Sequence, residues 1–187
     1  MSLHLVRPAH EHLDAYKAAL MQGWSGDSSR PEAAALEELA RISADADTYL
    51  DRQVDREALG DPVTLPDGSV VARLPGLRMW LWDGEFCGVI GLRWQNGTTD
   101  LPPHCLGHIG YSVVPWKRGL GYATAALGLM LPLARAEGLA HVDITTDVGN
   151  LASQRVIVAN GGQCLGTFTK PVPFGSTQGL RYRIALV

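Results

Sequence analysis

Residues 107–124 read Gly-His-Ile-Gly-Tyr-Ser-Val-Val-Pro-Trp-Lys-Arg-Gly-Leu-Gly-Tyr-Ala-Thr, and this stretch decides the fold. The apolar run Ile109–Val114 predicts a strand, which Pro115 ends, and a basic, glycine-rich turn then leads directly into a helical pattern. Glycines let several backbone N–H groups turn toward one ligand, and the start of a helix adds a partial positive charge. Lys117 and Arg118 add full charges. The stretch therefore predicts a binding site for phosphate or pyrophosphate.

Length and composition indicate one ordinary domain with a sizeable core, because 46% of the 187 residues are hydrophobic. A net charge of −3 argues against a protein that binds nucleic acid. No run approaches the roughly 18 apolar residues of a membrane span, and the first residues lack the apolar region of a signal peptide. We expect a cytoplasmic protein that does not associate with a membrane. The three cysteines are far apart, which favours free thiols over disulfides or a metal site: Cys87, Cys105 and Cys164.

The first 76 residues predict a short strand near Leu3, three helices and a long loop over residues 60–76. The first two helices begin near residue 9 and at Pro31, and the third is predicted over Asp47–Leu59. Residues 25–30 form the predicted loop between the first two helices. The acidic side chains of these helices either lie on solvated faces or form a negative rim that attracts a cationic substrate: Glu32, Glu37, Glu38, Asp45, Asp47, Asp51, Asp55 and Glu57.

The remainder predicts strands and helices in alternation around the quoted stretch. Asp83-Gly84 lies between two apolar runs, which is a strong hairpin signal. A strand is expected over 104–114, and the helix after the glycines reaches to about residue 138, with Pro132 expected to kink it. A buried strand over 141–146 precedes a helix that Asn150 caps, and two strands end the chain, over 163–169 and 180–186.

The glycine pattern by itself has several interpretations. Gly119-Leu120-Gly121 partly matches a dinucleotide fingerprint, but that motif opens a domain of repeated βαβ units, whereas here it lies late and follows an antiparallel hairpin. A Walker loop would need Gly-Lys-Ser/Thr, which this stretch lacks. A plain structural turn, in which the glycines only allow tight packing, is the simplest alternative.

Two spaced motifs point to a family. Arg118-x-x-Gly121-x-Ala123 resembles the Arg/Gln-x-x-Gly-x-Gly/Ala loop of the Gcn5-related N-acetyltransferase (GNAT) superfamily. The segment from Asn150 through Ser153 and Val156 to Gly161 resembles the Asn-x-x-Ser-x-x-Val-x-x-x-x-Gly segment of the same superfamily. Residues 77–187 follow the superfamily's order of elements, and residues 1–76 match in outline only. The sequence of residues 107–119 looks most like that of a bacterial branch of predicted acetyltransferases without an assigned substrate.

The resemblance implies an α/β (α+β) fold with a mixed, mostly antiparallel twisted sheet of about six or seven strands, flanked by helices. A central β-α-β unit would form an acyl-CoA cleft. We expect one domain over residues 1–187, in which 1–76 form a variable N-terminal part and 77–187 the acetyl-CoA-binding core. Whether the protein is a monomer or a homodimer is left open by the sequence.

The same resemblance implies acetyl-CoA as the donor and no metal. Its pyrophosphate would bind the backbone of Arg118–Thr124, and its pantetheine arm would pair with the main chain of two residues of the preceding strand as an added strand. A backbone N–H there could also polarise the thioester carbonyl. The predicted cofactor-binding residues are Val113, Val114, Lys117, Arg118, Gly119, Leu120, Gly121, Tyr122, Ala123, Thr124, Asn150 and Ser153.

The resemblance also suggests where chemistry occurs. An amine must lose a proton before it attacks, and His108 is the candidate base, because the superfamily often has a glutamate there and imidazole titrates near neutral pH. The alternative is a histidine that only organises the strand. Many relatives carry a tyrosine acid seven residues after the motif's asparagine, but this chain has Ile157. Tyr111 and Tyr122 are possible substitutes.

The sequence therefore predicts an N-acetyltransferase that moves an acetyl group from acetyl-CoA to a primary amine of a small molecule or peptide by direct attack on the thioester. The alternative is a non-catalytic module that binds or senses acyl-CoA, because the missing tyrosine weakens catalysis without affecting cofactor binding. The acceptor itself is not encoded in any motif.

Overall fold

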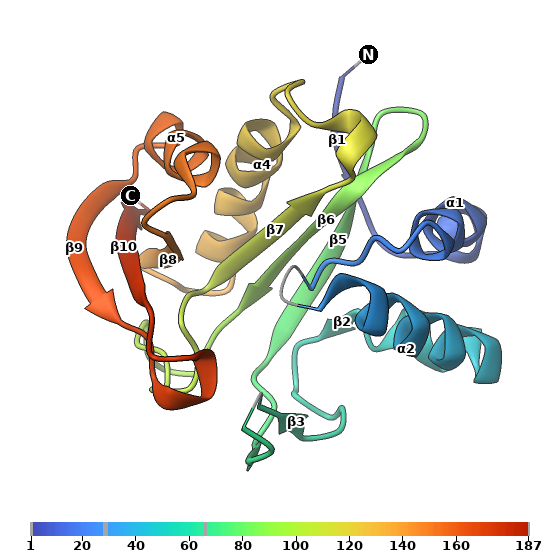
Figure 1. Ribbon diagram of the computed structural model, residues 1–187, viewed down its shortest axis with the longest axis horizontal. Helices are drawn as coiled ribbons and strands as arrows, with labels where there is room; N and C mark the ends of the chain where they lie inside the picture. The colour runs from blue at the N-terminus through green and yellow to red at the C-terminus, as the bar shows by residue number, and fades with distance from the viewer. Residues whose placement is uncertain (1, 28–29, 66, 187) are drawn as a thin grey trace.

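The computed structural model describes residues 2–27, 30–65 and 67–186. Two antiparallel sheets lie side by side with helices on both faces (Figure 1). The elements in chain order are β1 (His4–Val6), α1 (His10–Met21), α2 (Pro31–Ala44), α3 (Ala46–Asp51), β2 (Val54–Asp55), β3 (Val63–Thr64), β4 (Val70–Val71), β5 (Gly76–Trp82), β6 (Phe86–Arg93), β7 (Ile109–Val113), η1 (Pro115–Lys117), α4 (Tyr122–Ala136), β8 (His141–Asp147), α5 (Leu151–Ala159), β9 (Gln163–Thr169), η2 (Val172–Phe174) and β10 (Gln178–Ala185).

The strands are divided between two main sheets. The first has the order β1-β5-β6-β7, with β2 also paired to β5, and the second has the order β8-β10-β9. All of these pairs are antiparallel. The predicted mixed α/β fold with a mostly antiparallel sheet flanked by helices is confirmed. The division falls between β7 and β8, so both strands offer an edge toward the same gap.

Two hydrophobic clusters hold the helices to the sheets. Because side chains alternate along a strand, Leu81 of β5 faces the cluster that contains Leu127 and Met130 of α4. Trp80, its neighbour, faces the other cluster, where its ring stacks on Tyr16 of α1 with centroids 4.6 Å apart. Figure 1 accordingly shows α4 and α5 on one side of the strands and α1 and α2 on the other. None of the helices in the described ranges is long and apolar enough to cross a membrane.

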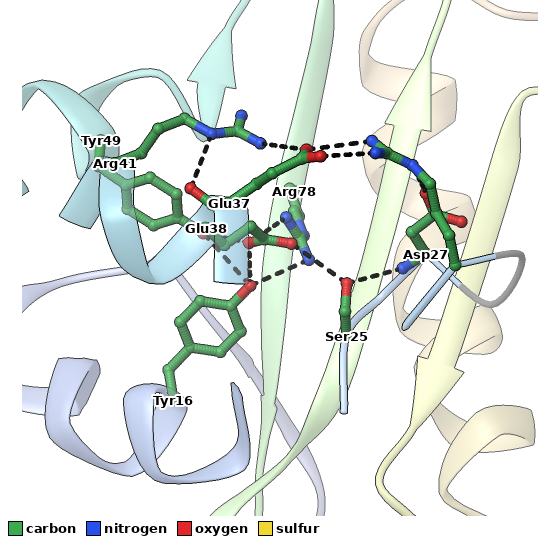
Figure 2. Close-up of polar contacts among 9 residues, drawn as sticks. Tyr16, Ser25, Asp27, Glu37, Glu38, Arg41, Tyr49 and Arg78 are labelled. Carbon is green, nitrogen blue, oxygen red and sulfur yellow. Dashed lines mark hydrogen bonds and ion pairs between the residues drawn. The ribbon is translucent and has the colours of Figure 1, made fainter. Parts of the chain in front are cut away.

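A buried polar network joins the N-terminal helices to the sheet (Figure 2). Glu38 of α2 is only 7% exposed, and its carboxylate accepts hydrogen bonds from the hydroxyls of Tyr16 and Tyr49. Arg78 of β5 donates to the same oxygen at 3.2 Å, and Ser25 donates to the other at 3.4 Å. Burial alone would raise the pKa of Glu38, but the Arg78 charge and the two tyrosine hydroxyls outweigh it and lower that pKa. Glu38 is therefore a buried anion, which neither interpretation of the acidic helices anticipates.

The predicted third helix is wrong in extent. Asp45 caps it, with an oxygen 3.0 Å from the Thr48 nitrogen, but α3 ends at Asp51. Val54 pairs with Leu77 in β2, so strand pairing overrides the helical spacing. The predicted loop over 60–76 contains the small hairpin β3–β4, and the predicted strand over 104–114 shortens to β7. Residue 66 of that loop and residues 28–29 of the 25–30 loop lie outside the described residues, and α4 continues through Pro132.

Candidate active site

The glycine-rich turn has the backbone shape that an anion site needs. Gly119 and Gly121 have φ angles of 78° and 77°, in the left-handed region that side chains disfavour. A Cβ atom at either position would meet no atom within 4 Å, so conformation and not space requires glycine there. Gly121 is the residue before α4, and its carbonyl accepts the Ala125 N–H at 3.0 Å. In the described part of the chain, the N–H groups of residues 122–124 therefore have no partner and point out of the helix start.

One carboxylate holds both ends of this turn. Asp83, in the hairpin between β5 and β6, has a side chain only 6% exposed and accepts from Lys117 Nζ at 3.0 Å. The Tyr122 hydroxyl donates to the same Asp83 oxygen at 2.5 Å. Burial opposes the charge on Asp83, but the bonds from Tyr122 and Lys117 prevail and hold its pKa well below the usual range. Lys117 also contacts Glu85 at 2.9 Å, and these two acids raise the pKa of its ammonium.

This arrangement changes the roles predicted for the turn. Lys117 is engaged with the hairpin, which argues against its predicted direct contact with a pyrophosphate. Arg118 is exposed, and its Nε donates to the Val113 carbonyl at 3.2 Å, so its charge stays beside the helix start. Asp83 was visible in the sequence only as a turn residue, because no local pattern connects it to a lysine 34 positions later.

A cleft opens between β7 and β8. A cavity of about 270 Å³ lies there, bounded by Ile109–Tyr111 on one side and Ile144–Asp147 on the other, with Asn150, Ser153 and Lys170 completing its wall. Val114 N–H donates to Cys87 of β6 at 3.0 Å. Because successive backbone groups alternate in direction along a strand, the Val113 N–H points away from β6, toward the free edge of β7. Val113 can thus pair with an added strand, whereas the Val114 N–H is already occupied.

The structure places the predicted base, His108, in the protein interior. His108 is only 1% exposed, and its Nδ1 accepts the Asp143 backbone N–H at 2.9 Å. Nε2 lies 3.0 Å from the Thr99 carbonyl, to which it donates. Burial lowers the pKa of His108 and favours this neutral ring. Both ring nitrogens are engaged in hydrogen bonds inside the protein. His108 instead joins the start of β7 to β8.

A pair of hydroxyl groups crosses the cleft. Tyr111 of β7 places its Oη 2.8 Å from Ser153 Oγ at the start of α5. Asn150 accepts the Ser153 N–H at 3.0 Å and caps the helix, which fixes the position of that serine. Burial raises the pKa of Tyr111, so the phenol is protonated at neutral pH. Ile157 is fully buried in the core, and the Tyr122 hydroxyl is bound to Asp83. Of the two substitutes for the missing tyrosine, only Tyr111 lines the cleft.

Comparison with known proteins identifies the family. The family model described as "Acetyltransferase (GNAT) domain" matches residues 3–163. The chain belongs to the GNAT acetyltransferase family. The match to the GNAT domain includes the N-terminal helices, which resemble the superfamily in outline only. No curated protein matches the chain.

Solved structures share the GNAT fold. The microcin C7 self-immunity acetyltransferase MccE, in complex with acetyl-CoA and AMP, superposes with a TM-score of 0.63 at 13% identity, covering 98% of this chain and 92% of that chain. RimL, a ribosomal L7/L12 alpha-N-protein acetyltransferase in complex with coenzyme A, gives 0.64 at 17% identity over 99% and 94%. A Salmonella typhimurium enzyme that modifies the N-terminal serine of L7/L12 gives 0.57 at 16% over 99% and 95%. At these identities the likeness establishes the fold.

Membership of the family makes this protein an acyltransferase of the GNAT type. The described residues contain no group of three or more histidine, cysteine, aspartate or glutamate side chains that could hold a metal ion.

Proposed function

We propose that this GNAT enzyme transfers the acetyl group of acetyl-CoA to a primary amine of a small molecule or peptide, by direct attack on the thioester in the cleft between β7 and β8. The observation that carries the proposal is that the glycine-rich turn at residues 118–124 adjoins the free edge of β7. The turn at 118–124 begins five residues after Val113, whose carbonyl accepts from Arg118. A ligand with a pyrophosphate and an extended amide arm matches both features.

The binding roles follow from the backbone. The pyrophosphate is attracted by the Arg118 charge and by the backbone N–H groups of residues 122–124. The positive φ angles of the glycines orient these N–H groups toward the ligand. Leu120 is exposed at the tip of the turn and contributes its backbone. The free edge of β7 pairs with the pantetheine arm in the manner of an added strand. The Val113 N–H on this edge is the donor for the thioester oxygen as negative charge develops there.

The hydroxyl pair supplies a proton for the leaving group. When the amine nitrogen bonds to the acetyl carbon, the carbon–sulfur bond breaks and the thiolate must be stabilised. The hydroxyl oxygens of Tyr111 and Ser153 lie 2.8 Å apart in the cleft. One hydroxyl can therefore donate a proton to the sulfur while the second hydroxyl donates a hydrogen bond to the first. Burial raises the pKa of Tyr111, so the phenol stays protonated at neutral pH and can donate a hydrogen bond to the developing thiolate. The amine proton leaves to solvent, since both ring nitrogens of His108 are engaged in hydrogen bonds.

An acetylation screen tests this function. The protein is incubated with acetyl-CoA and a panel of aliphatic amines and peptides, and thiol release is followed together with the acetyl-CoA dissociation constant. Turnover that falls with Arg118→Glu, because charge reversal at the helix start repels the pyrophosphate, supports the proposal. Unchanged acetyl-CoA affinity in that variant would show that the ligand binds elsewhere.

A second candidate is an acyl-CoA-binding or sensing module without catalysis. The observation that favours it is the engagement of His108 in hydrogen bonds on both nitrogens, which removes the predicted base. Micromolar binding of acetyl-CoA with no thiol release on any amine would favour the sensor. Thiol release above the rate without protein on even one amine would exclude it.

A further inference from the structure

The cleft contains an ion pair to which the proposed acetyl transfer assigns no role. Lys170, the residue after β9, places its Nζ against the carboxylate of Asp147, the last residue of β8. Both residues line the same cavity as Tyr111 and Ser153. The Lys170 backbone N–H donates to the Thr177 carbonyl at 2.9 Å, so the base of its side chain is fixed at the start of the β9–β10 connection. An ammonium group therefore already lies at the wall of the proposed acetyl-transfer site.

The two partners differ in accessibility. The Asp147 side chain is 65% exposed, whereas the Lys170 side chain is 18% exposed. An ion pair with one largely solvated partner contributes little to stability, so another ammonium can replace Lys170 at small cost. The lysine has a flexible four-carbon stem, which lets its head move aside without movement of the backbone. Asp147 is thus a carboxylate that a ligand can reach.

The neighbouring acid lacks this freedom. Asp143 lies on the same strand and binds Arg183 through two hydrogen bonds of 2.7 and 2.9 Å. Arg183 and Asp143 pair directly across β10 and β8, and the bidentate geometry fixes both side chains. Asp143 also donates its backbone N–H to His108. Of these two β8 carboxylates, only Asp147 combines a largely exposed side chain with a place in the cavity wall.

We propose that Asp147 anchors the ammonium form of the acceptor and that Lys170 competes with the acceptor for this anchor. The inference rests on the proposed acetyl transfer and names its substrate class: an aliphatic primary amine that arrives as a cation. A lysine ammonium is the same chemical group as such an acceptor, so the ion pair shows that the position is suited to it. The amine loses its proton to solvent before it attacks the thioester, as in the proposed reaction.

The competition predicts opposite effects for the two partners. Asp147→Asn should raise the KM of an aliphatic amine by about three- to tenfold, because the anchoring charge is lost. Lys170→Met should lower that KM by about two- to threefold, because the internal competitor is removed while the apolar stem is retained. The dissociation constant of acetyl-CoA should stay within twofold in both variants. A purely structural ion pair would change both variants in the same direction.

The experiment uses butylamine and the best aliphatic acceptor of the panel as probes, with aniline, which is neutral at pH 7, as the uncharged control. The KM for aniline should not respond to Asp147→Asn. Thermal unfolding of each variant identifies any loss of fold, and the conservative variant Asp147→Glu should recover part of the aliphatic KM. Equal KM values in wild type and Asp147→Asn, with turnover intact, would refute the role of Asp147 as the anchor and leave the proposed acetyl transfer standing. Absence of turnover in the wild type, with acetyl-CoA still bound, would overturn the proposed function and the anchor with it.

Discussion

Replacement of Asp83 by asparagine should weaken acetyl-CoA binding about tenfold, although Asp83 does not face the ligand. Its carboxylate accepts from Lys117 and Tyr122, which stand on either side of Gly119 and Gly121. Asparagine keeps the size but removes the charge, and a hydrogen bond to a charged group contributes about 1.5–3 kcal/mol. Lys117 retains Glu85 at 2.9 Å, so we expect the lower end of that range to be lost from the binding conformation of the turn. A loss of about 1.4 kcal/mol corresponds to a tenfold change in the dissociation constant.

Calorimetric titration with acetyl-CoA measures this effect, and acetyl-pantetheine, which lacks the pyrophosphate, is the control ligand. Asp83→Asn should leave the acetyl-pantetheine affinity unchanged, because that ligand does not reach the turn. Glu85→Gln is the matched control variant: its side chain is 76% exposed, and its loss should change the acetyl-CoA dissociation constant by no more than about twofold. An unchanged acetyl-CoA affinity in Asp83→Asn, with a lowered melting temperature, would show that Asp83 only stabilises the hairpin and would refute the reasoning.

Three other predictions concern the cleft and the polar network. Tyr111→Phe and Ser153→Ala should each lower kcat, measured by thiol release, by about a hundredfold, and Tyr111→Phe should leave the acetyl-CoA dissociation constant unchanged; an unchanged kcat would exclude the hydroxyl pair as proton donor. Burial lowers the pKa of His108 below 6.5, so unfolding takes up a proton and stability should fall as the pH drops below 6.5. His108→Gln should flatten that part of the stability profile in denaturant titrations, and an equal slope in the variant would contradict a buried neutral ring. Glu38→Gln leaves the Arg78 charge unpaired and should lower the free energy of unfolding by about 3 kcal/mol, whereas a melting temperature equal to wild type would show that the network is dispensable.

The sequence predicts those parts of the site that depend on neighbouring residues. Gly121 before a helical pattern indicates the left-handed turn, and Asn150 three residues before Ser153 indicates the cap, since both features arise within one turn of chain. The long-range ion pairs that hold the site and the N-terminal helices in place could not be predicted in this way. Asp83 meets Lys117 across 34 positions, and Glu38 meets Arg78 across 40, so only the packing of β5 against distant elements brings them together.

The predicted extent of the third helix is wrong for a related physical reason. Leu50, Val54 and Ala58 have the spacing of a helical face, but intrinsic preference is a weak term against tertiary pairing. Val54 pairs with Leu77, and the Asp55 carboxylate accepts the N–H groups of Leu59 and Gly60 at 2.8 and 2.9 Å, which turns the chain back. A periodic pattern at the edge of a sheet can thus end as a strand when a partner strand is available.

His108 links the two strands that border the cleft. Its backbone N–H donates to the Asp143 carbonyl at 2.7 Å, and its ring accepts the Asp143 N–H, so β7 and β8 are tied at this point. A Cβ atom at Gly107 would lie 3.0 Å from the Asp143 carbonyl oxygen, so a side chain there would push the two segments a few tenths of an ångström apart. Three residues after His108, Tyr111 of β7 faces a cavity whose other side is formed by Ile144–Asp147 of β8. The strands therefore diverge between positions 108 and 111, and a substitution that loosens the tie should close or misplace the cleft even though it removes no group that touches substrate.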